Sequence, residues 1–364
     1  MKRLNVDLGD RSYPILIGEG ILSRMPEFLA ERGIKTVNKL LIVTDDTVAG
    51  YHLAPLQEIL TQAGYSAAVH TVPAGEQSKT LEQFEEVITS ALKAGLDRHS
   101  VIIALGGGVV GDLAGFAAAS FMRGIRFVQV PTTILAHDSS VGGKVAVNHR
   151  FAKNIIGAFH QPELVLFDTA LLKTLPQREI RAGLAEVIKE GLIWDADFVA
   201  WCEEHADALL ALSPEETAYA LYNGCHVKAQ VVSQDEREQS LRAILNLGHT
   251  IGHALEAVAQ YQQLLHGEAI SIGMVGSAKL AVRLGYDPEI YTTTKRILQK
   301  FGLPVRIPHD YSTEQILQAM MHDKKFRDGK MVFVVPVAIG KTEIRDDIEA
   351  SWIKEIIDEL KQEA

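Results

Sequence analysis

The sequence predicts two domains, an α/β domain followed by a mostly helical one. In the first part of the chain, short β-branched runs alternate with helical patterns, as in parallel sheets that are covered by helices. After Leu175-Pro176 nearly every segment looks helical. We therefore expect an α/β domain over residues 1–174 and a helical domain over residues 175–364, closely packed with a cleft between them.

We expect a sheet in the first domain because five β-type runs occur there. Most of them are separated by helical segments such as 53–64 and 79–94. The runs contain many Val, Ile and Phe residues and are only five or six residues long, as buried strands of parallel sheets are. They are LLIVTD (40–45), AAVHTV (67–72), VIIALG (101–106), RFVQVP (126–131) and LVLFD (164–168).

The second domain is rich in Ala, Glu and Leu from Arg178 to Lys324, a composition that favours helices. We expect its helices to break where turn-forming residues interrupt the pattern. These breaks are Asp195, Ser213, Gly248, Gly267, Asp287 and Gly302. Two β-like runs, 331–340 and 342–347, precede a terminal helix, and no repeat or low-complexity linker is visible.

Composition narrows the classes of function. The 364 residues carry 36 basic and 46 acidic side chains, a net charge of −10, so no overall field attracts nucleic acid or anionic lipid. Two cysteines fit a reducing compartment. The start MKRLNVDLGD lacks the apolar run of a signal peptide, and no stretch is apolar enough to span a membrane. We expect a cytoplasmic protein with no nucleic-acid or membrane partner.

A glycine-rich turn follows the third β-type run, in Gly106-x-Gly108-x-x-Gly111, and leads into a helix. This is the context of the dinucleotide fingerprint, although the same turn also occurs without a ligand. The acidic residue usual about 20 positions later is missing. Asp45, at the end of an earlier strand, is the alternative partner for a ribose hydroxyl, and it would imply a strand order unlike the common Rossmann layout. The loop VPAGEQSKT, with Glu76 and Lys79, would lie at the same sheet edge.

Three histidines raise the possibility of a metal site. His249 and His253 share a helix face at i, i+4, and His266 follows closely. HTIGH is not the zinc-protease motif, because Thr250 replaces its glutamate. Catalytic zinc takes three ligands from His, Glu and Asp, so the third ligand is either the remaining histidine or a carboxylate. Glu186 is the best carboxylate, although it and Lys189 would also suit a surface ion pair.

Basic side chains lie in two places that suit an anion. The turn SSVGGK carries Lys144 and is followed by Lys153-Asn154, but it is not a Walker A loop and would also suit a solvated loop. Lys228 lies on a later helix. Arg242, Asn246, His249 and His253 form one helical stripe if Gly248 does not interrupt it, and such a stripe suits a hydroxylated, anionic ligand better than a core.

Taken together, residues 40–340 resemble the 3-dehydroquinate synthase family of sugar phosphate cyclases. The resemblance rests on GGGVVGD, FMRGIRFVQVPTT, DSSVGGK, KNIIGAFHQP, RAGLAEVIK, LRAILNLGHTIGHALE and LHGEA, which occur in the family's order. Two departures are visible: AHDSS is one residue shorter than the commoner form, and Leu247 stands where phenylalanine is frequent. Neither departure changes a chemical group.

The resemblance implies a Rossmann-like NAD-binding domain, a helical metal- and substrate-binding domain and an active site in the cleft between them. It implies Zn²⁺ or Co²⁺ on Glu186, His249 and His266. It also implies NAD contacts by Asp45, Glu76, Lys79, Gly106, Gly107, Gly108, Asp112, Thr132, Thr133, Lys144, Lys153 and Thr174. Contacts with substrate hydroxyls and carboxylate would come from Asp138, Lys144, Lys189, Lys228, Arg242 and Asn246. Around the phosphate it implies Lys144, Asn154, His253, Lys324 or Lys325, and Arg123 from the second subunit of a homodimer.

The implied activity is the conversion of 3-deoxy-D-arabino-heptulosonate 7-phosphate to 3-dehydroquinate and phosphate, a step of aromatic amino acid biosynthesis. A metal- and NAD-dependent alcohol dehydrogenase is one alternative, and it would accumulate NADH. A sister cyclase such as 2-deoxy-scyllo-inosose synthase is another. A non-catalytic sensor of NAD or metal is the third, and it would bind without turnover.

Overall fold

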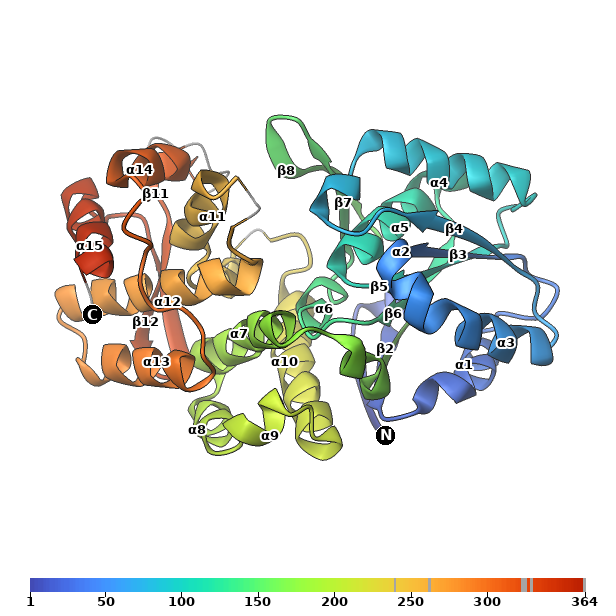
Figure 1. Ribbon diagram of the computed structural model, residues 1–364, viewed down its shortest axis with the longest axis horizontal. Coiled ribbons are helices and arrows are strands. Elements are labelled where there is room, and N and C mark those ends of the chain that lie inside the picture. The colour runs from blue at the N-terminus through green and yellow to red at the C-terminus, as the bar shows by residue number, and fades with distance from the viewer. Residues whose placement is uncertain (239, 261–262, 322–325, 328–329, 363–364) are drawn as a thin grey trace. The chain divides into compact units, whose positions relative to one another are not determined.

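The computed structural model describes all residues except 239, 261–262, 322–325, 328–329 and 363–364. The chain forms two compact units, which can be followed by colour in Figure 1. The first contains Met1–Leu175 and Pro214–Arg237, and the second contains Pro176–Ser213 and Glu238–Ala364. None of the helices among the described residues combines the length and apolar character of a transmembrane span.

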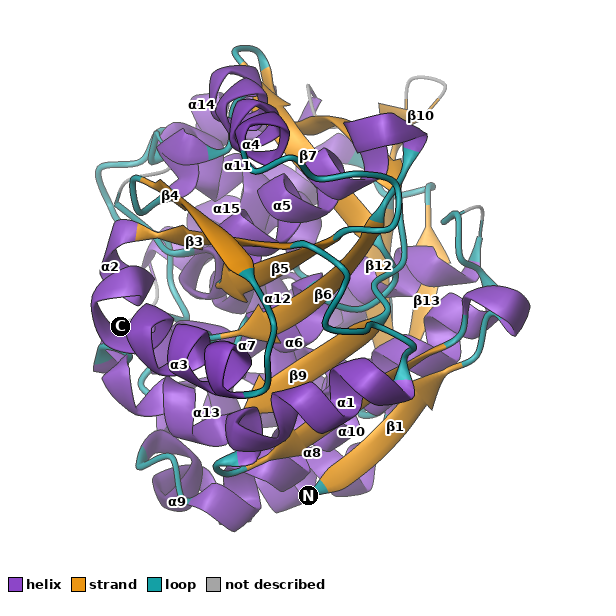
Figure 2. Ribbon diagram, turned by 90° about the vertical axis from the view of Figure 1, so that its right-hand side faces the viewer, coloured by secondary structure: helices purple, strands orange, loops and turns teal. Residues whose placement is uncertain are grey.

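A seven-stranded sheet forms the centre of the first unit, and Figure 2 draws its strands in orange. All five predicted strands are present with the predicted bounds: β3 (Leu40–Asp45), β4 (Ala67–Val72), β5 (Val101–Gly106), β6 (Arg126–Pro131) and β9 (Leu164–Asp168). Two strands that the sequence did not predict, β1 (Lys2–Val6) and β2 (Tyr13–Gly18), extend the sheet. The order is β1-β2-β9-β6-β5-β3-β4, with only β1 antiparallel to its neighbour.

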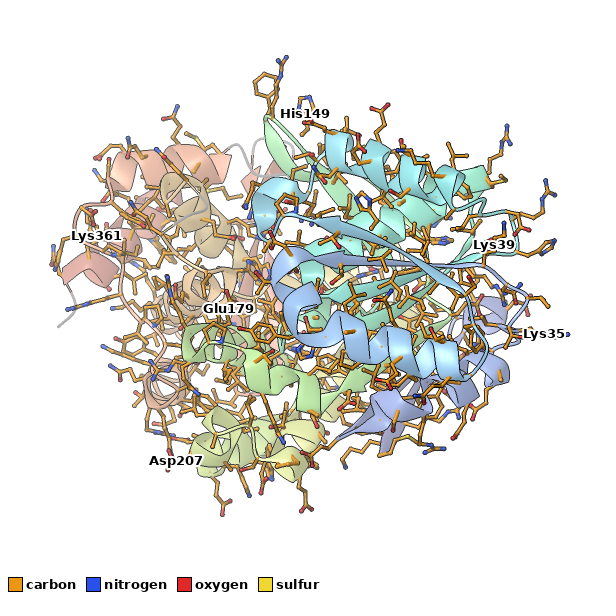
Figure 3. All side chains as sticks on the ribbon, turned by 45° about the vertical axis from the view of Figure 1, so that its right-hand side comes forward. Lys35, Lys39, His149, Glu179, Asp207 and Lys361 are labelled. Carbon is orange, nitrogen blue, oxygen red and sulfur yellow. The ribbon has the colours of Figure 1, made fainter. Side chains whose placement is uncertain are left out.

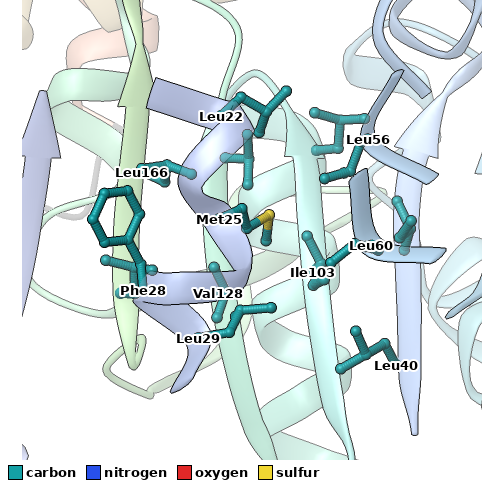
Figure 4. Close-up of a cluster of buried hydrophobic side chains, with 14 of the residues drawn as sticks. Leu22, Met25, Phe28, Leu29, Leu40, Leu56, Leu60, Ile103, Val128 and Leu166 are labelled. Carbon is teal, nitrogen blue, oxygen red and sulfur yellow. The ribbon is translucent and has the colours of Figure 1, made fainter. Parts of the chain in front are cut away.

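Helices cover both faces of this sheet because its strands are apolar on both sides. On one face, α1 (Met25–Glu31) and α3 (Ala54–Gln62) pack Met25, Leu56 and Leu60 against strand residues such as Ile103 (Figure 4). On the other face lie α4 (Leu81–Lys93) and α5 (Gly108–Ser120), which bury Val87 and Leu113. The shorter helices of this unit are α2 (Asp46–Val48) and α6 (Ala136–Ser139).

The connections of the sheet change direction between β3 and β5. From β3 the chain runs outward to β4, whereas from β5 it runs the other way to β6 and β9. In open α/β sheets, ligands bind beside the carboxyl ends of the strands at such a switch point. This order differs from the common Rossmann order, as the position of Asp45 suggested. Asp45 and Gly106, which end β3 and β5, are brought to this edge by the parallel pairing of Thr44 with Leu105.

A β-hairpin, β7 (Lys144–His149) and β8 (Ala152–Phe159), lies outside the main sheet and packs on α5. From sequence this segment also suited a solvated loop, because β8 has no buried residue and shows no regular apolar alternation. His149 lies near the hairpin's tip, as Figure 3 shows. The hairpin carries Lys144, Lys153 and Asn154, and Asn154 adopts the left-handed φ of +54°.

The second unit is mostly helical, as predicted, and α12 (His266–Arg283) is its central element. This helix packs against α7 (Gln177–Trp194), α11 (His249–Val258), α13 (Glu289–Lys300) and α15 (Ala350–Gln362). The remaining helices are α8 (Ala196–Glu204), α9 (Ala206–Leu210) and α14 (Thr313–Met321). The predicted late strand pair is present as β12 (Phe333–Ala338) and β13 (Lys341–Arg345), and two short strands, β10 (Phe326–Arg327) and β11 (Lys330–Met331), precede it.

Two of the expectations for the helical part were wrong. Gly267 does not break a helix but lies in the first turn of α12, where a Cβ atom would come within 1.9 Å of the carbonyl oxygen of Ala182 in α7. Residues 214–237 belong to the first unit, because α10 (Pro214–Gln234) packs on β1, β2 and α6. Helical periodicity shows that α10 has an apolar face but not which partner covers it.

Candidate active site

Glu186, His249 and His266 converge in the second unit. Glu186 lies in the middle of α7, His249 begins α11 and His266 begins α12. Each offers one ligand atom, and the three atoms lie within 4.8 Å of one another. The Glu186 Oε1 atom is 3.6 Å from His249 Nε2 and 3.2 Å from His266 Nε2. Two imidazoles and a carboxylate are a common ligand set for catalytic zinc, so the residues present fit such an ion.

Each of these three side chains is also held from outside the group. The Nδ1 atom of His249 is 3.1 Å from the carbonyl oxygen of Leu247. The Nδ1 atom of His266 is 3.3 Å from Glu256 Oε2. Lys189 forms an ion pair with the second oxygen of Glu186. Partners of this kind orient metal ligands before the metal arrives.

His266 is a cation in the metal-free protein at neutral pH. Burial alone would lower its pKa, but the charge of Glu256 and hydrogen bonds to Glu186 and Glu256 outweigh that effect and raise the pKa to about 10. The imidazolium therefore bridges two carboxylates, and a metal ion would have to replace a proton on Nε2.

The interior of α7 carries three charged side chains with almost no exposure to solvent. Glu186 and Lys189 are 1% exposed and Glu190 is fully buried. Lys189 contacts both carboxylates, with 3.5 Å between its Nζ atom and Glu190 Oε1. Of the two interpretations of Glu186 and Lys189, the surface ion pair is thus wrong, because both side chains are buried. Charges buried to this extent persist where their partners hold them, and they are frequent in functional sites.

The predicted stripe from Arg242 to His253 is not one continuous helix. Gly248 adopts φ +78°, which ends a 3-10 helix over Leu241–Asn246 and starts α11 in a new direction. Arg242 is nonetheless 1% exposed, and Asn246 donates to Glu238 Oε1 at 3.1 Å. His253 remains beside the metal candidates, with 5.1 Å between its ring centre and that of His249.

In the first unit, the glycine-rich turn joins β5 to α5. Gly107 caps the start of α5, so the first N–H groups of a 13-residue helix have no partner within the helix. Thr132, just after β6, is 2% exposed, and no partner for its hydroxyl is found among the described residues. Asp45 caps α2 by accepting from the N–H of Val48 at 2.8 Å. Burial raises the pKa of its carboxyl group. These groups suit the phosphates and hydroxyls of a dinucleotide.

Lys79 connects the loop after β4 to the hairpin. It is 4% exposed, forms an ion pair with Asp112 of α5 and donates to the side chain of Asn154. Burial raises the pKa of Asp112, and the nearby charge of Lys79 opposes that rise. Asn148 donates to Glu76 Oε1 at 2.7 Å and accepts from the backbone N–H of Asn154 at 2.9 Å.

Asp138 and Lys228 form a second polar pair in the first unit. Lys228, on α10, lies 2.8 Å from Asp138 Oδ2 and also donates to the Asp138 carbonyl oxygen. Its side chain is 9% exposed. The pair explains why α10 belongs with this unit although its neighbours in sequence do not.

The remaining predicted residues lie in several places. Lys144 is exposed at the start of β7. Lys153 is 3.9 Å from Glu76 Oε1. Arg123 is exposed in a turn with φ +69°. The Thr174 hydroxyl bonds to His52 at 3.0 Å and donates to the carbonyl oxygen of Leu171 at 3.1 Å, and neither partner is a predicted cofactor residue. Lys324 and Lys325 lie outside the described residues.

Family models match both parts of the chain: 3-dehydroquinate synthase N-terminal over residues 69–182 and 3-dehydroquinate synthase C-terminal over residues 183–326. The 3-dehydroquinate synthase of Desulforamulus reducens is 48% identical over 98% of this chain and 99% of its own. The chain belongs to the 3-dehydroquinate synthase family. The resemblance expected from the sequence is thereby confirmed.

Two solved structures of sugar phosphate cyclases share the fold over nearly the whole chain. 2-Deoxy-scyllo-inosose synthase, solved with carbaglucose-6-phosphate, NAD⁺ and Co²⁺, matches with a TM-score of 0.89 and 28% identity over 98% of this chain and 99% of that one. 2-Epi-5-epi-valiolone synthase from Streptomyces hygroscopicus subsp. jinggangensis, solved with NAD⁺ and Zn²⁺, matches with a TM-score of 0.88 and 28% identity over 97% and 98%. The predicted fold of this chain, an α/β part followed by a mostly helical part, is thus shared with these two cyclases.

Sequence reasoning missed Glu256, Glu190 and Asn148. Glu256 follows His249 and His253 at i+7 and i+3, so the helical spacing that selected the histidines also places it on their face. Glu190 adjoins Lys189 in a helix that is otherwise largely apolar, which was a second available signal. Asn148 gave no such signal, because its role depends on a hairpin that the sequence did not predict.

Proposed function

We propose that the chain converts 3-deoxy-D-arabino-heptulosonate 7-phosphate to 3-dehydroquinate and phosphate, as a carbon–oxygen lyase. The observation that carries this proposal is the group of Glu186, His249 and His266, already oriented by outer partners, in a chain of this family. Three protein ligands leave a coordination position open for substrate, as in catalytic zinc sites, whereas structural zinc sites are closed by four protein ligands.

The chain would hold Zn²⁺ or Co²⁺ on Glu186, His249 and His266. It would hold NAD beside Asp45, the glycine-rich turn and Thr132. When bound, the metal would supply polarisation of a substrate hydroxyl and NAD would supply reversible hydride transfer. Because the conversion as a whole involves no net oxidation, NAD would not be consumed.

The side chains of the protein bind and orient the substrate. Lys189, Arg242 and Asn246 in the second unit, with Asp138 and Lys228 in the first, provide donors and acceptors for its hydroxyl groups and carboxylate. His253 serves as a proton-transferring or hydrogen-bonding group. Because the net charge is −10, an anionic substrate must be held by local cations of this kind.

Lys144, Asn154 and His253 bind the phosphate, together with Lys324 or Lys325 and Arg123 of a second copy in a homodimer. Lys144 and Asn154 lie on the same hairpin, and Arg123 is exposed. An exposed arginine held in a fixed turn is suited to an anion outside its own chain. If Arg123 acts in this way, mixed dimers of Arg123→Ala and His253→Ala chains will regain activity that neither variant has alone.

The decisive experiment measures phosphate release from 3-deoxy-D-arabino-heptulosonate 7-phosphate by metal-loaded protein with trace NAD⁺, while NADH absorbance is followed. We expect many phosphates per NAD⁺, no accumulating NADH and loss of turnover after treatment with EDTA. Steady NADH without phosphate would instead indicate a dehydrogenase. A higher rate on the substrate of 2-deoxy-scyllo-inosose synthase would indicate a sister cyclase.

A further inference from the structure

The two ring nitrogens of His266 face two different carboxylates. Its Nε2 atom lies 3.2 Å from Glu186 Oε1, in the proposed metal site. Its Nδ1 atom lies 3.3 Å from Glu256 Oε2, outside that group. Glu256 is 4% exposed and comes from α11, whereas His266 is the first residue of α12. A buried carboxylate from one helix therefore holds a proposed ligand on another.

His249 shows the same arrangement with a weaker acceptor. Its Nδ1 atom faces the Leu247 carbonyl oxygen at 3.1 Å, and its Nε2 atom faces Glu186 Oε1. A proton on Nδ1 of each ring would leave both Nε2 atoms available to one ion. The difference is that His249 donates to a neutral carbonyl group and His266 to a carboxylate.

His266 needs an outer partner more than the other two ligands do. The side chain of Glu186 is 1% exposed and that of His249 is 12% exposed, whereas that of His266 is 30% exposed. His249 and His266 both begin their helices, so greater exposure is what sets His266 apart from His249. Packing alone thus leaves the ring of His266 the least restrained of the three.

We propose that Glu256 is a positioning residue of the metal site, which fixes the tautomer and orientation of His266 and increases its strength as a ligand. The inference rests on the proposed metal site. It assigns to Glu256 no contact with the substrate. Removal of such an outer carboxylate lowers metal affinity by about 10- to 100-fold in other proteins.

A different role for Glu256 has to be separated from this one. His253, Glu256 and His266 form a second group with ligand atoms within 4.8 Å of one another. In that group His266 would have to bind a second ion through Nδ1 while Nε2 serves the first. A neutral imidazole has one free nitrogen lone pair, so the two roles exclude each other unless the ring loses its last proton.

The test compares Glu256→Gln with Glu203→Gln. Glu203 is a matched control, because it is also a partly buried carboxylate of the second unit with a cationic partner, Arg296 at 2.7 Å, but lies outside the metal candidates. Zn²⁺ affinity of each metal-free protein would be measured by competition with a chromophoric chelator at several pH values up to about 10, and compared at the upper end. Glu256 raises the pKa of His266, so at lower pH its removal would also weaken proton competition. Absorption of the Co²⁺-loaded proteins reports the ligand geometry.

We expect Glu256→Gln to bind one Zn²⁺ about 10- to 100-fold more weakly than the wild type and to shift the Co²⁺ bands. Glu203→Gln should match the wild type in both measurements. Glu256→Asp, which keeps the charge on a shorter side chain, should recover part of the affinity and serves if Glu256→Gln does not fold.

Three results would contradict the proposal in different ways. Unchanged Zn²⁺ affinity and an unchanged Co²⁺ spectrum in both Glu256 variants would overturn the role of Glu256 but leave the proposed metal site standing. Two Zn²⁺ per wild-type chain, falling to one in Glu256→Gln, would make Glu256 a ligand of a second ion. A wild-type chain that binds no metal would overturn the proposed function and this inference with it.

Discussion

Single residues at the metal candidates are coupled by charge. His266 lies between Glu186 and Glu256, and Lys189 lies between Glu186 and Glu190. Two cations thus alternate with three carboxylates, and only the His266 side chain among the five is appreciably exposed to solvent. In such surroundings, a change in one charge alters the pKa or the free energy of the others.

Metal uptake should release a proton at neutral pH. The pKa of His266 is raised from an ordinary value of 6.5 to about 10, so the metal-free ring is charged and must lose a proton when it becomes a ligand. Calorimetry in buffers with different ionisation enthalpies measures this proton. Heats that do not depend on the buffer would contradict the expectation.

The same pKa predicts how the stability of the metal-free protein varies with pH. Because the folded value lies above the unfolded one, the contribution of His266 is fully present below about pH 6.5 and is lost as the pH rises through about 10. The test is urea unfolding of the wild type and of His266→Gln at several pH values. Between about pH 6.5 and about pH 10, the free energy of unfolding should fall less in His266→Gln than in the wild type.

Lys189→Met should destabilise the metal-free protein strongly. The substitution nearly preserves volume but removes the cation that contacts Glu186 and Glu190. Removing one partner of a buried ion pair costs about 3–5 kcal/mol in the free energy of unfolding. Denaturant unfolding measures it, and Lys279→Met, whose ion pair with Glu359 lies at the surface, is the control. A loss below that of the control would show that water reaches these carboxylates.

Asp45→Asn should weaken NAD binding without unfolding α2. Asparagine can still accept from the N–H of Val48, so the cap is preserved while the charge is lost. Loss of a hydrogen bond to a charged group of about 1.5–3 kcal/mol corresponds to roughly 10- to 100-fold in affinity. Fluorescence titration with NADH measures the affinity. Asp97→Asn, which changes an exposed aspartate away from the cofactor candidates, is the control. Equal affinity in all three proteins would exclude Asp45 from the cofactor site.

Among the helices and strands, the sequence predicted those that the pattern of apolar residues determines. The five strands from β3 to β9 were predicted with the observed bounds because each is a short apolar run that ends at a polar or turn-forming residue. The hairpin β7–β8 was missed because β8 has no buried residue, so its sequence lacks the apolar alternation of a half-buried strand. The break at Gly267 was wrong because the sequence does not distinguish a glycine that ends a helix from one that permits helices to approach.

Gly267→Ala tests whether this glycine is needed for the close approach of α7 and α12. The added Cβ atom would overlap the Ala182 carbonyl oxygen of α7, so α12 must move and His266 must move with it. We expect a loss of about 1–3 kcal/mol in the free energy of unfolding and weaker Zn²⁺ binding. Gly50→Ala, where a Cβ atom meets nothing within 4 Å, should change neither quantity appreciably. Wild-type metal affinity in Gly267→Ala would mean that the helices adjust without moving the ligand.

At the scale of the whole molecule, the chain passes between the two units three times, after Leu175, Ser213 and Arg237. The sequence predicted a domain boundary near the first crossing and gave no sign of the other two. Composition changes at Leu175-Pro176, whereas α10 looks like the helices on either side of it. Only its packing on β1 and β2 assigns it to the first unit.

A chain that ends at Leu175 should therefore not fold stably, although it contains every strand of the main sheet. It would lack the apolar side of α10, including Leu221 and Val231, and the partner of Asp138. We expect it to aggregate or to bind a dye for exposed apolar surface, and addition of residues 214–237 through a flexible linker should restore folding. A stable, cooperative transition in the shorter chain would show that α10 is dispensable.

The position of α10 also sets an order of events during synthesis. The N-terminal sheet leaves the ribosome complete at Asp168, but the helix that covers β1 and β2 emerges only after α7, α8 and α9 of the other unit. At a synthesis rate of about 5–20 residues per second, this interval lasts several seconds. During that time the apolar face formed by β1 and β2 is exposed to solvent. A chaperone that binds nascent chains would have its longest opportunity in that interval.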